Sequence, residues 1–166
     1  MSQPDDAKNL RERVRRLYDD HGPALLAYAC ALMRDRAAAE DILHQVFLKL
    51  LSGRVSVPDP PRAYLFRAIH NAALNTQRSS MRHVEFDPES AWFEAPNGRP
   101  ELAIALEAAL KELPQQQTQA VILRIWAQMT FEEAASVVGV SPNTLASRYR
   151  YGLAKLRELL RNMERE

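Results

Sequence analysis

Cysteine and glycine are scarce in this sequence: it has one cysteine, Cys30, and five glycines in 166 residues. A single cysteine excludes an internal disulfide framework. Because it stands in an apolar stretch, we expect a buried thiol rather than a reactive one. No apolar run reaches the roughly 18 residues of a membrane span, and the N-terminus has no apolar signal core. We therefore expect a cytoplasmic protein without a membrane span.

Patterns typical of catalysis and metal binding are missing as well. There is no glycine-rich phosphate loop and no nucleophile motif. The histidines, at positions 21, 44, 70 and 83, are scattered and have no cysteine or carboxylate cluster at ligand spacing. We expect no enzymatic activity, no metal and no cofactor.

The alternating pattern of exposed strands is also absent, and long segments rich in Ala, Leu, Arg and Glu predict an all-α protein. The net charge is only +1, but it is unevenly spread. Residues 1–82 carry 13 Lys and Arg against 9 Asp and Glu, whereas residues 83–100 carry one arginine against four carboxylates. The second segment has three prolines and no helical period, which predicts an extended acidic linker. Two small helical domains follow, at residues 1–82 and 101–166.

Four helices are predicted in the first domain, over residues 10–18, 23–34, 37–51 and 62–78. Pro23 is expected to begin the second helix, because proline fits the first turn. The run PDPP at residues 58–61 predicts a loop before the fourth. That last helix mixes aromatic, amide and basic side chains, which suits single-stranded nucleic acid. The alternative is that its aromatic rings belong to the core.

A helix-turn-helix is predicted within residues 130–161. Thr130 and Glu133 have the spacing of a capping box, and Gly139 favours the left-handed conformation that ends helices. Ser141 and Pro142 then supply the N-cap and first turn of the next helix. The intervening turn of about three residues is typical of this motif.

Two further helices are predicted before this motif, over residues 101–113 and 115–127. In the second of them, four apolar side chains are expected to be buried: Val121, Ile122, Ile125 and Trp126.

The last helix of the motif has two distinct faces. An apolar stripe should pack on the first helix: Leu145, Tyr149, Leu153, Leu156 and Leu160. Polar and basic residues occupy the other face of its N-terminal half: Asn143, Thr144, Ser147, Arg148, Arg150 and Tyr151. A recognition helix meets base edges and phosphates with this part. The alternative is a helical hairpin whose charges are only solvated.

Three segments together resemble an extracytoplasmic-function sigma factor. They are residues 17–50, beginning LYDDHGPALL, then PPRAYLFRAIHNAALN, then residues 110–159, beginning LKELPQQQTQ. The resemblance covers most of the chain and implies two helical domains, called region 2 and region 4, that give bacterial RNA polymerase its promoter specificity. It implies core polymerase and promoter DNA as partners, and it leaves open an anti-sigma factor.

The resemblance also implies roles for particular residues. Three on a clamp-docking helix would face core polymerase: Glu40, Asp41 and Gln45. Others would open and read the −10 element as a single strand, with the loop at 76–83 near a flipped base: Tyr64, Arg67, His70, Asn71, Asn75, Arg78 and Arg82. A third set would contact the −35 duplex: Arg124, Asn143, Thr144, Ser147, Arg148, Arg150 and Tyr151.

The sequence departs from the family pattern at several of these positions. Gln45 stands where relatives usually have a carboxylate, which predicts weaker binding to core polymerase. Ala146 and Tyr151 stand where relatives usually have basic residues, so contacts with DNA phosphates are expected to be lost there. The preferred −35 sequence is therefore not transferable from relatives.

Two other classes of function fit parts of the sequence. One is a dimeric helix-turn-helix regulator whose N-terminal domain senses a ligand or dimerises. The other is a helical module that sequesters another regulator, which would need no basic recognition face. The basic, aromatic helix at 62–78 favours the sigma factor. The acidic linker is then expected to thread the polymerase cleft with Trp92 and Phe93 as apolar anchors, the alternative being a solvated spacer.

Overall fold

The computed structural model describes residues 4–79, 92 and 99–166, and all of its secondary-structure elements within these residues are helices. The helices are α1 (Pro4–Met33), α2 (Arg36–Leu51), α3 (Arg62–Ser79), α4 (Pro100–Glu112), α5 (Gln115–Ile125), α6 (Phe131–Val138) and α7 (Pro142–Arg165). The all-α prediction is confirmed. Most of the predicted linker lies outside the described residues. None of the described helices has the length and apolarity of a membrane span.

The first helix corrects the sequence prediction of two helices divided at Pro23. α1 is continuous through this proline. Proline removes one helical hydrogen bond, but buried side chains continue along α1 on both sides of it, including Leu17, Leu25 and Tyr28. Tertiary packing of that apolar face therefore outweighs the local signal to break the helix.

The fifth helix ends earlier than predicted. α5 stops at Ile125, and the next residue caps it. Val121 and Ile122 are fully buried as expected, whereas Ile125 is 43% exposed and Trp126 is half-buried. The prediction of burial was wrong for Ile125, whereas Trp126 is partly buried and packs against the core.

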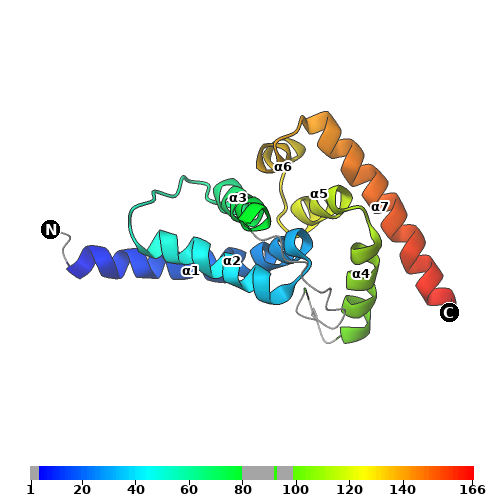
Figure 1. Cartoon of the computed structure of the whole chain (residues 1–166), viewed down its shortest axis with the longest axis horizontal. Coiled ribbons are helices and arrows are strands. Elements are labelled where there is room, and N and C mark those ends of the chain that lie inside the picture. The colour runs from blue at the N-terminus through cyan, green and yellow to red at the C-terminus, as the bar shows by residue number, and fades with distance from the viewer. Residues whose placement is uncertain (1–3, 80–91, 93–98) are drawn as a thin grey trace.

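Two groups of helices form the molecule, and the groups contact each other (Figure 1). α2 and α3 pack on α1, while α4, α5 and α6 pack on α7. Between the groups, α1 contacts α5 and α3 contacts α6. Buried side chains from α1 to α7 form a continuous apolar core. The two units predicted from the sequence are thus docked together in the free chain.

Three residues of the predicted linker are described, and the first of them, Trp92, is attached to α4; the other two, Arg99 and Pro100, begin that helix. Trp92 is only 2% exposed, and its backbone N–H donates to Glu107 Oε1 at 2.8 Å. The Lys111 ammonium lies 5.4 Å from the centre of its ring. The free chain therefore buries the ring that the sequence suggested as an anchor for polymerase. Phe93 lies outside the described residues.

Candidate nucleic-acid interface

The helix-turn-helix is formed by α6 and α7, with the caps predicted from the sequence. Glu133 N–H donates to Thr130 Oγ1 at 3.1 Å, and Thr130 N–H donates to the Glu133 carboxylate at 3.4 Å. Gly139 ends α6 in the left-handed conformation with φ 78°. Ser141 caps α7 by accepting from Thr144 N–H at 3.2 Å. These local signals therefore place α6 and α7 at the spacing of a DNA-reading motif.

The two faces of α7 are as predicted. Leu145 and Leu156 are buried on the inner face. On the outer face of the N-terminal half, four of the predicted DNA contacts are exposed and two are half-buried: Asn143, Thr144, Arg150 and Tyr151 in the first group, and Ser147 and Arg148 in the second. Within this face Arg150 donates to Ser147 Oγ at 3.4 Å. The polar groups that a recognition helix needs are accessible here.

Arg124 lies inside the motif instead. Its guanidinium is 4.4 Å from the ring centre of Phe131 and 5.6 Å from that of Tyr149. Its Nη1 donates to the carbonyl of Met129 in the turn before α6. The arginine therefore links α5, α6 and α7. Its predicted contact with −35 DNA stays a prediction.

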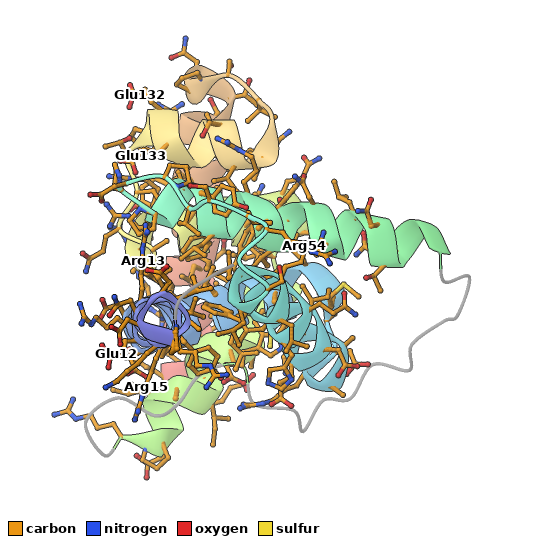
Figure 2. The ribbon with its side chains drawn as sticks, turned by 90° about the vertical axis from the view of Figure 1, so that its left-hand side faces the viewer. Glu12, Arg13, Arg15, Arg54, Glu132 and Glu133 are labelled. Carbon is orange, nitrogen blue, oxygen red and sulfur yellow. The ribbon has the colours of Figure 1, made fainter. Side chains whose placement is uncertain are left out.

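A groove of about 1090 Å³ lies between α2, the loop after it and α3. Four of the predicted −10 residues line it: Tyr64, Arg67, Asn71 and Asn75. The sequence analysis missed two cations of the same groove, Lys49 and Arg54. Figure 2 shows Arg54 between α2 and α3. In the sequence, Arg54 differs from other basic residues only by its position next to Gly53, in the loop before the helix predicted to bind nucleic acid.

The remaining predicted −10 residues are placed differently. The Tyr28 hydroxyl and Nδ1 of His70 share a hydrogen bond at 2.8 Å, and the two rings stack. Burial lowers the pKa of His70, which keeps its imidazole neutral at pH 7. His70 packs toward α1 and does not line the groove. Arg78 belongs to α3, but its side chain and the whole of Arg82 lie outside the described residues.

The predicted polymerase contacts lie on α2. Glu40 accepts from Arg36 Nε at 2.9 Å one turn away, so its carboxylate is paired within the helix. Asp41 and Gln45 are exposed and one turn apart on the same face. Gln45 also lines the α2–α3 groove. Within the described residues, no group of three or more His, Cys, Asp or Glu side chains is arranged to hold a metal.

Comparisons with known proteins cover both helical units. Residues 17–83 match the family model of Sigma-70 region 2, and residues 103–156 match that of Sigma-70 region 4. The chain is 31% identical to the RNA polymerase sigma factor CarQ of Myxococcus xanthus, over 90% of each protein. It is 30% identical to the ECF sigma factor EcfG of Rhodopseudomonas palustris, over 83% of this chain and 80% of that protein.

A solved structure agrees with these matches. The sigma factor RpoE of Bartonella quintana, in complex with the anti-sigma factor NepR, superposes with a TM-score of 0.71 at 26% identity, covering 89% of this chain and 96% of that one. The sigma regions imply core RNA polymerase and promoter DNA as partners. The chain belongs to the extracytoplasmic-function sigma factors and is an alternative sigma factor that directs promoter recognition and transcription initiation.

Proposed function

We propose that residues 1–82 bind core polymerase and the −10 element, and that residues 101–166 bind the −35 element. One observation carries the assignment: the α2–α3 groove gathers aromatic, amide and basic groups, whereas α7 presents a polar face on a capped helix-turn-helix. These two chemistries suit single-stranded and duplex DNA, respectively.

The α2–α3 groove offers each kind of contact that an unpaired strand needs. The Tyr64 ring can stack on a base, and the amides of Asn71 and Asn75 can pair with base edges. Lys49 and Arg54, on the opposite wall and the loop, supply charge for phosphates. The groove therefore binds the separated −10 strand.

The duplex contact is assigned to the start of α7. Arg148 and Arg150 are suited to guanine edges and phosphates, and Asn143 is suited to adenine. Their position in the first turns matches the way recognition helices enter the major groove. At Tyr151 an exposed aromatic ring stands in place of a cation, so an apolar contact with a thymine methyl group takes the place of a phosphate contact there.

The polymerase contact is assigned to the exposed side of α2. Asp41 provides a carboxylate, and Leu48 and Leu51 are 65% and 44% exposed. Exposed leucines beside charged groups are typical of a protein interface.

The chain then acts as a binding protein in the cytoplasm, without a catalytic step or cofactor of its own. The Bartonella quintana relative is bound by an anti-sigma factor in its structure. We extend that partner class to this chain, with an anti-sigma factor holding it until a signal arrives.

Reconstitution with core polymerase tests the proposal. The chain should form a one-to-one complex on gel filtration and support run-off transcription from the region upstream of its own gene. A dimer that binds DNA without core polymerase, and that gives no transcript with it, would favour the helix-turn-helix regulator.

A further inference from the structure

A glycine lies in the interior of α7, at the point where this helix packs on α5 (Figure 1). Gly152 is buried, and its φ is not positive, so no left-handed conformation requires a glycine there. Inside a helix alanine is more favourable than glycine, because glycine loses more conformational freedom on folding. A glycine at this position therefore needs a reason other than helix formation.

The close approach of α7 to α5 supplies that reason. A Cβ atom on Gly152 would lie 3.1 Å from both Gln117 Cβ and Val121 Cγ2, and 3.3 Å from the carbonyl oxygen of Gln117. Ordinary contacts between carbon atoms are about 3.5–4.0 Å long. Gln117 and Val121 are four residues apart and share one face of α5. We call this part of α5, formed by Gln117 and Val121, the α5 seat.

The α5 seat cannot make room for a side chain by rotating its own atoms. The Cβ and carbonyl oxygen of Gln117 are fixed by the backbone of α5. Val121 is fully buried, and a β-branched side chain in a helix has one strongly preferred rotamer. α5 is itself held against α1 and α6. A methyl group at position 152 would therefore displace α7 from α5 by a few tenths of an ångström.

Two contacts with the same face of α5 fix the DNA-reading half of α7. One is Gly152 in the α5 seat, and the other is the Tyr149 ring, whose centre lies 5.6 Å from the Arg124 guanidinium. Arg124 follows Val121 by three residues and so lies on the same face of α5. Arg148 precedes Gly152 by one turn, about 6 Å along the helix axis, and borders the seat. A shift at position 152 therefore moves Arg148 with it.

We propose that Gly152 is a positioning residue for −35 recognition: because it has no side chain, α7 sits close on α5, and this sets how the DNA-reading face enters the major groove. The inference rests on the proposed function, because that assigns the −35 duplex to α7. Binding groups must be held within about 0.5 Å of their productive positions, so a displacement of a few tenths of an ångström changes base contacts. Side chains at different distances from the seat move by different amounts, so the base pairs are affected unequally.

The first test is Gly152→Ala in the full chain. Its binding is measured by fluorescence anisotropy with a −35 duplex from a promoter that the chain transcribes, and with a panel of duplexes that each differ from it by one base pair. Affinity for the parent duplex should fall about tenfold, a loss comparable to that of one base contact. The ratios of the affinities across the panel should also change. Ratios equal to those of the wild-type chain would overturn the proposal.

The ratios separate positioning from a loss of stability. A variant that only lowers the folded fraction weakens binding to all duplexes by one factor and leaves the ratios unchanged. Ala154→Gly is the matched control, because it exchanges the same two residue types at an exposed position of α7 two residues away. It should lower the urea midpoint, since glycine is less favourable than alanine in a helix, and keep the wild-type ratios. Altered ratios in this control, equal to those of Gly152→Ala, would overturn the proposal.

A second pair of variants tests the seat from the side of α5. Val121→Ala removes one of the atoms that a Cβ at position 152 would meet, whereas the contacts with Gln117 remain. In Val121→Ala with Gly152→Ala, the ratios should therefore lie between those of Val121→Ala and those of Gly152→Ala. If Gly152→Ala alone failed to fold by circular dichroism, this comparison decides: ratios equal in Val121→Ala and the double variant would overturn the proposal, and different ratios would support it.

These measurements distinguish the inference from the function on which it rests. A wild-type chain that bound no −35 duplex, free or with core polymerase, would overturn the proposed function and this inference with it. A wild-type chain that discriminates among the duplexes, beside a Gly152→Ala variant with the same ratios, would overturn the inference alone.

Discussion

Arg124 and Phe131 form a cation–π pair, with the guanidinium 4.4 Å from the ring centre. Phe131 in turn meets Tyr149 edge to face, with the ring centres 5.7 Å apart. The three residues come from α5, α6 and α7. Because the Arg124 guanidinium of α5 contacts a ring from α6 and a ring from α7, it fixes the angle between these helices.

We predict that Arg124→Met lowers the free energy of unfolding by about 1–3 kcal/mol, because it removes the cation–π contact and the bond to Met129 while keeping an apolar stem. Binding to −35 duplex should weaken as well. Arg124→Lys should recover only part of the stability, since an ammonium lacks the planar fork. Urea unfolding and anisotropy with labelled duplex measure both quantities. Lost DNA affinity at unchanged stability would instead make Arg124 a direct DNA contact.

Arg148→Ala should weaken binding to −35 duplex while leaving core-polymerase binding intact. The loss is about 1–3 kcal/mol for a base contact, and smaller and independent of sequence for a phosphate contact. A salt titration separates the two, because only phosphate contacts lower the salt slope. Arg157→Ala, an exposed arginine further along α7, is the matched control. Equal affinities for the two variants would remove Arg148 from the DNA-reading face.

Asp41→Arg should abolish association with core polymerase, since it reverses the charge of an exposed carboxylate on α2. The fold should survive because the side chain is exposed. Asp19→Arg makes the same change at an exposed position on α1 and should bind normally. Gel filtration with core polymerase measures association, and circular dichroism checks the fold. Normal binding by Asp41→Arg would contradict the role of this face.

The stability of the chain should fall as the pH drops below about 6.5. Burial lowers the pKa of both His21 and His70 from their usual value of 6.5, so the unfolded chain binds protons that the folded chain does not. Stability from these groups is complete above pH 6.5 and is lost as the pH falls toward their folded values. Urea midpoints at pH 7.5 and 5.5 measure the effect. His70→Gln, which keeps an acceptor for Tyr28, should reduce the difference; an unchanged difference would exclude His70.

The helix-turn-helix could be predicted from the sequence because its determinants are local. Thr130 and Ser141 each cap a helix by accepting a hydrogen bond from the backbone N–H three residues later. Gly139 ends α6 in the left-handed conformation, and its N–H donates to the carbonyl four residues earlier. The division of α1 at Pro23 was wrong for the opposite reason: the buried face that keeps the helix continuous depends on residues of α2 and α3, which no local pattern contains.

The candidate site was predictable only in part for the same reason. The sequence placed Tyr64, Asn71 and Asn75 on one helix, and this was enough to find one wall of the groove. Lys49 and Arg54 join it through the packing of α2 against α3, and His70 leaves it because Tyr28 of α1 binds it. Docking of the two domains depends on contacts more than 40 residues apart in the chain, such as those of Gln77 and Gln115 with the Leu32 carbonyl, so it had no local sequence signal.

The last prediction concerns Trp92, which lies within the predicted acidic linker. Its ring is buried against α4, whose Glu107 and Lys111 belong to the second domain, so we expect it to stay on that domain when the chain binds core polymerase. Trp92→Ala should lower the free energy of unfolding by about 3–5 kcal/mol, the usual cost of removing a buried tryptophan. Trp92→Phe should retain much of that stability.

Core-polymerase binding distinguishes this assignment from the alternative. If Trp92 stays on α4, both variants should bind core polymerase within about twofold of wild type at a temperature where they are folded, because the ring makes no contact with the partner. If it leaves α4 to anchor the linker in polymerase, Trp92→Ala should weaken binding far more than Trp92→Phe. Titration of labelled chain with core polymerase, beside urea unfolding of the free variants, decides between the two.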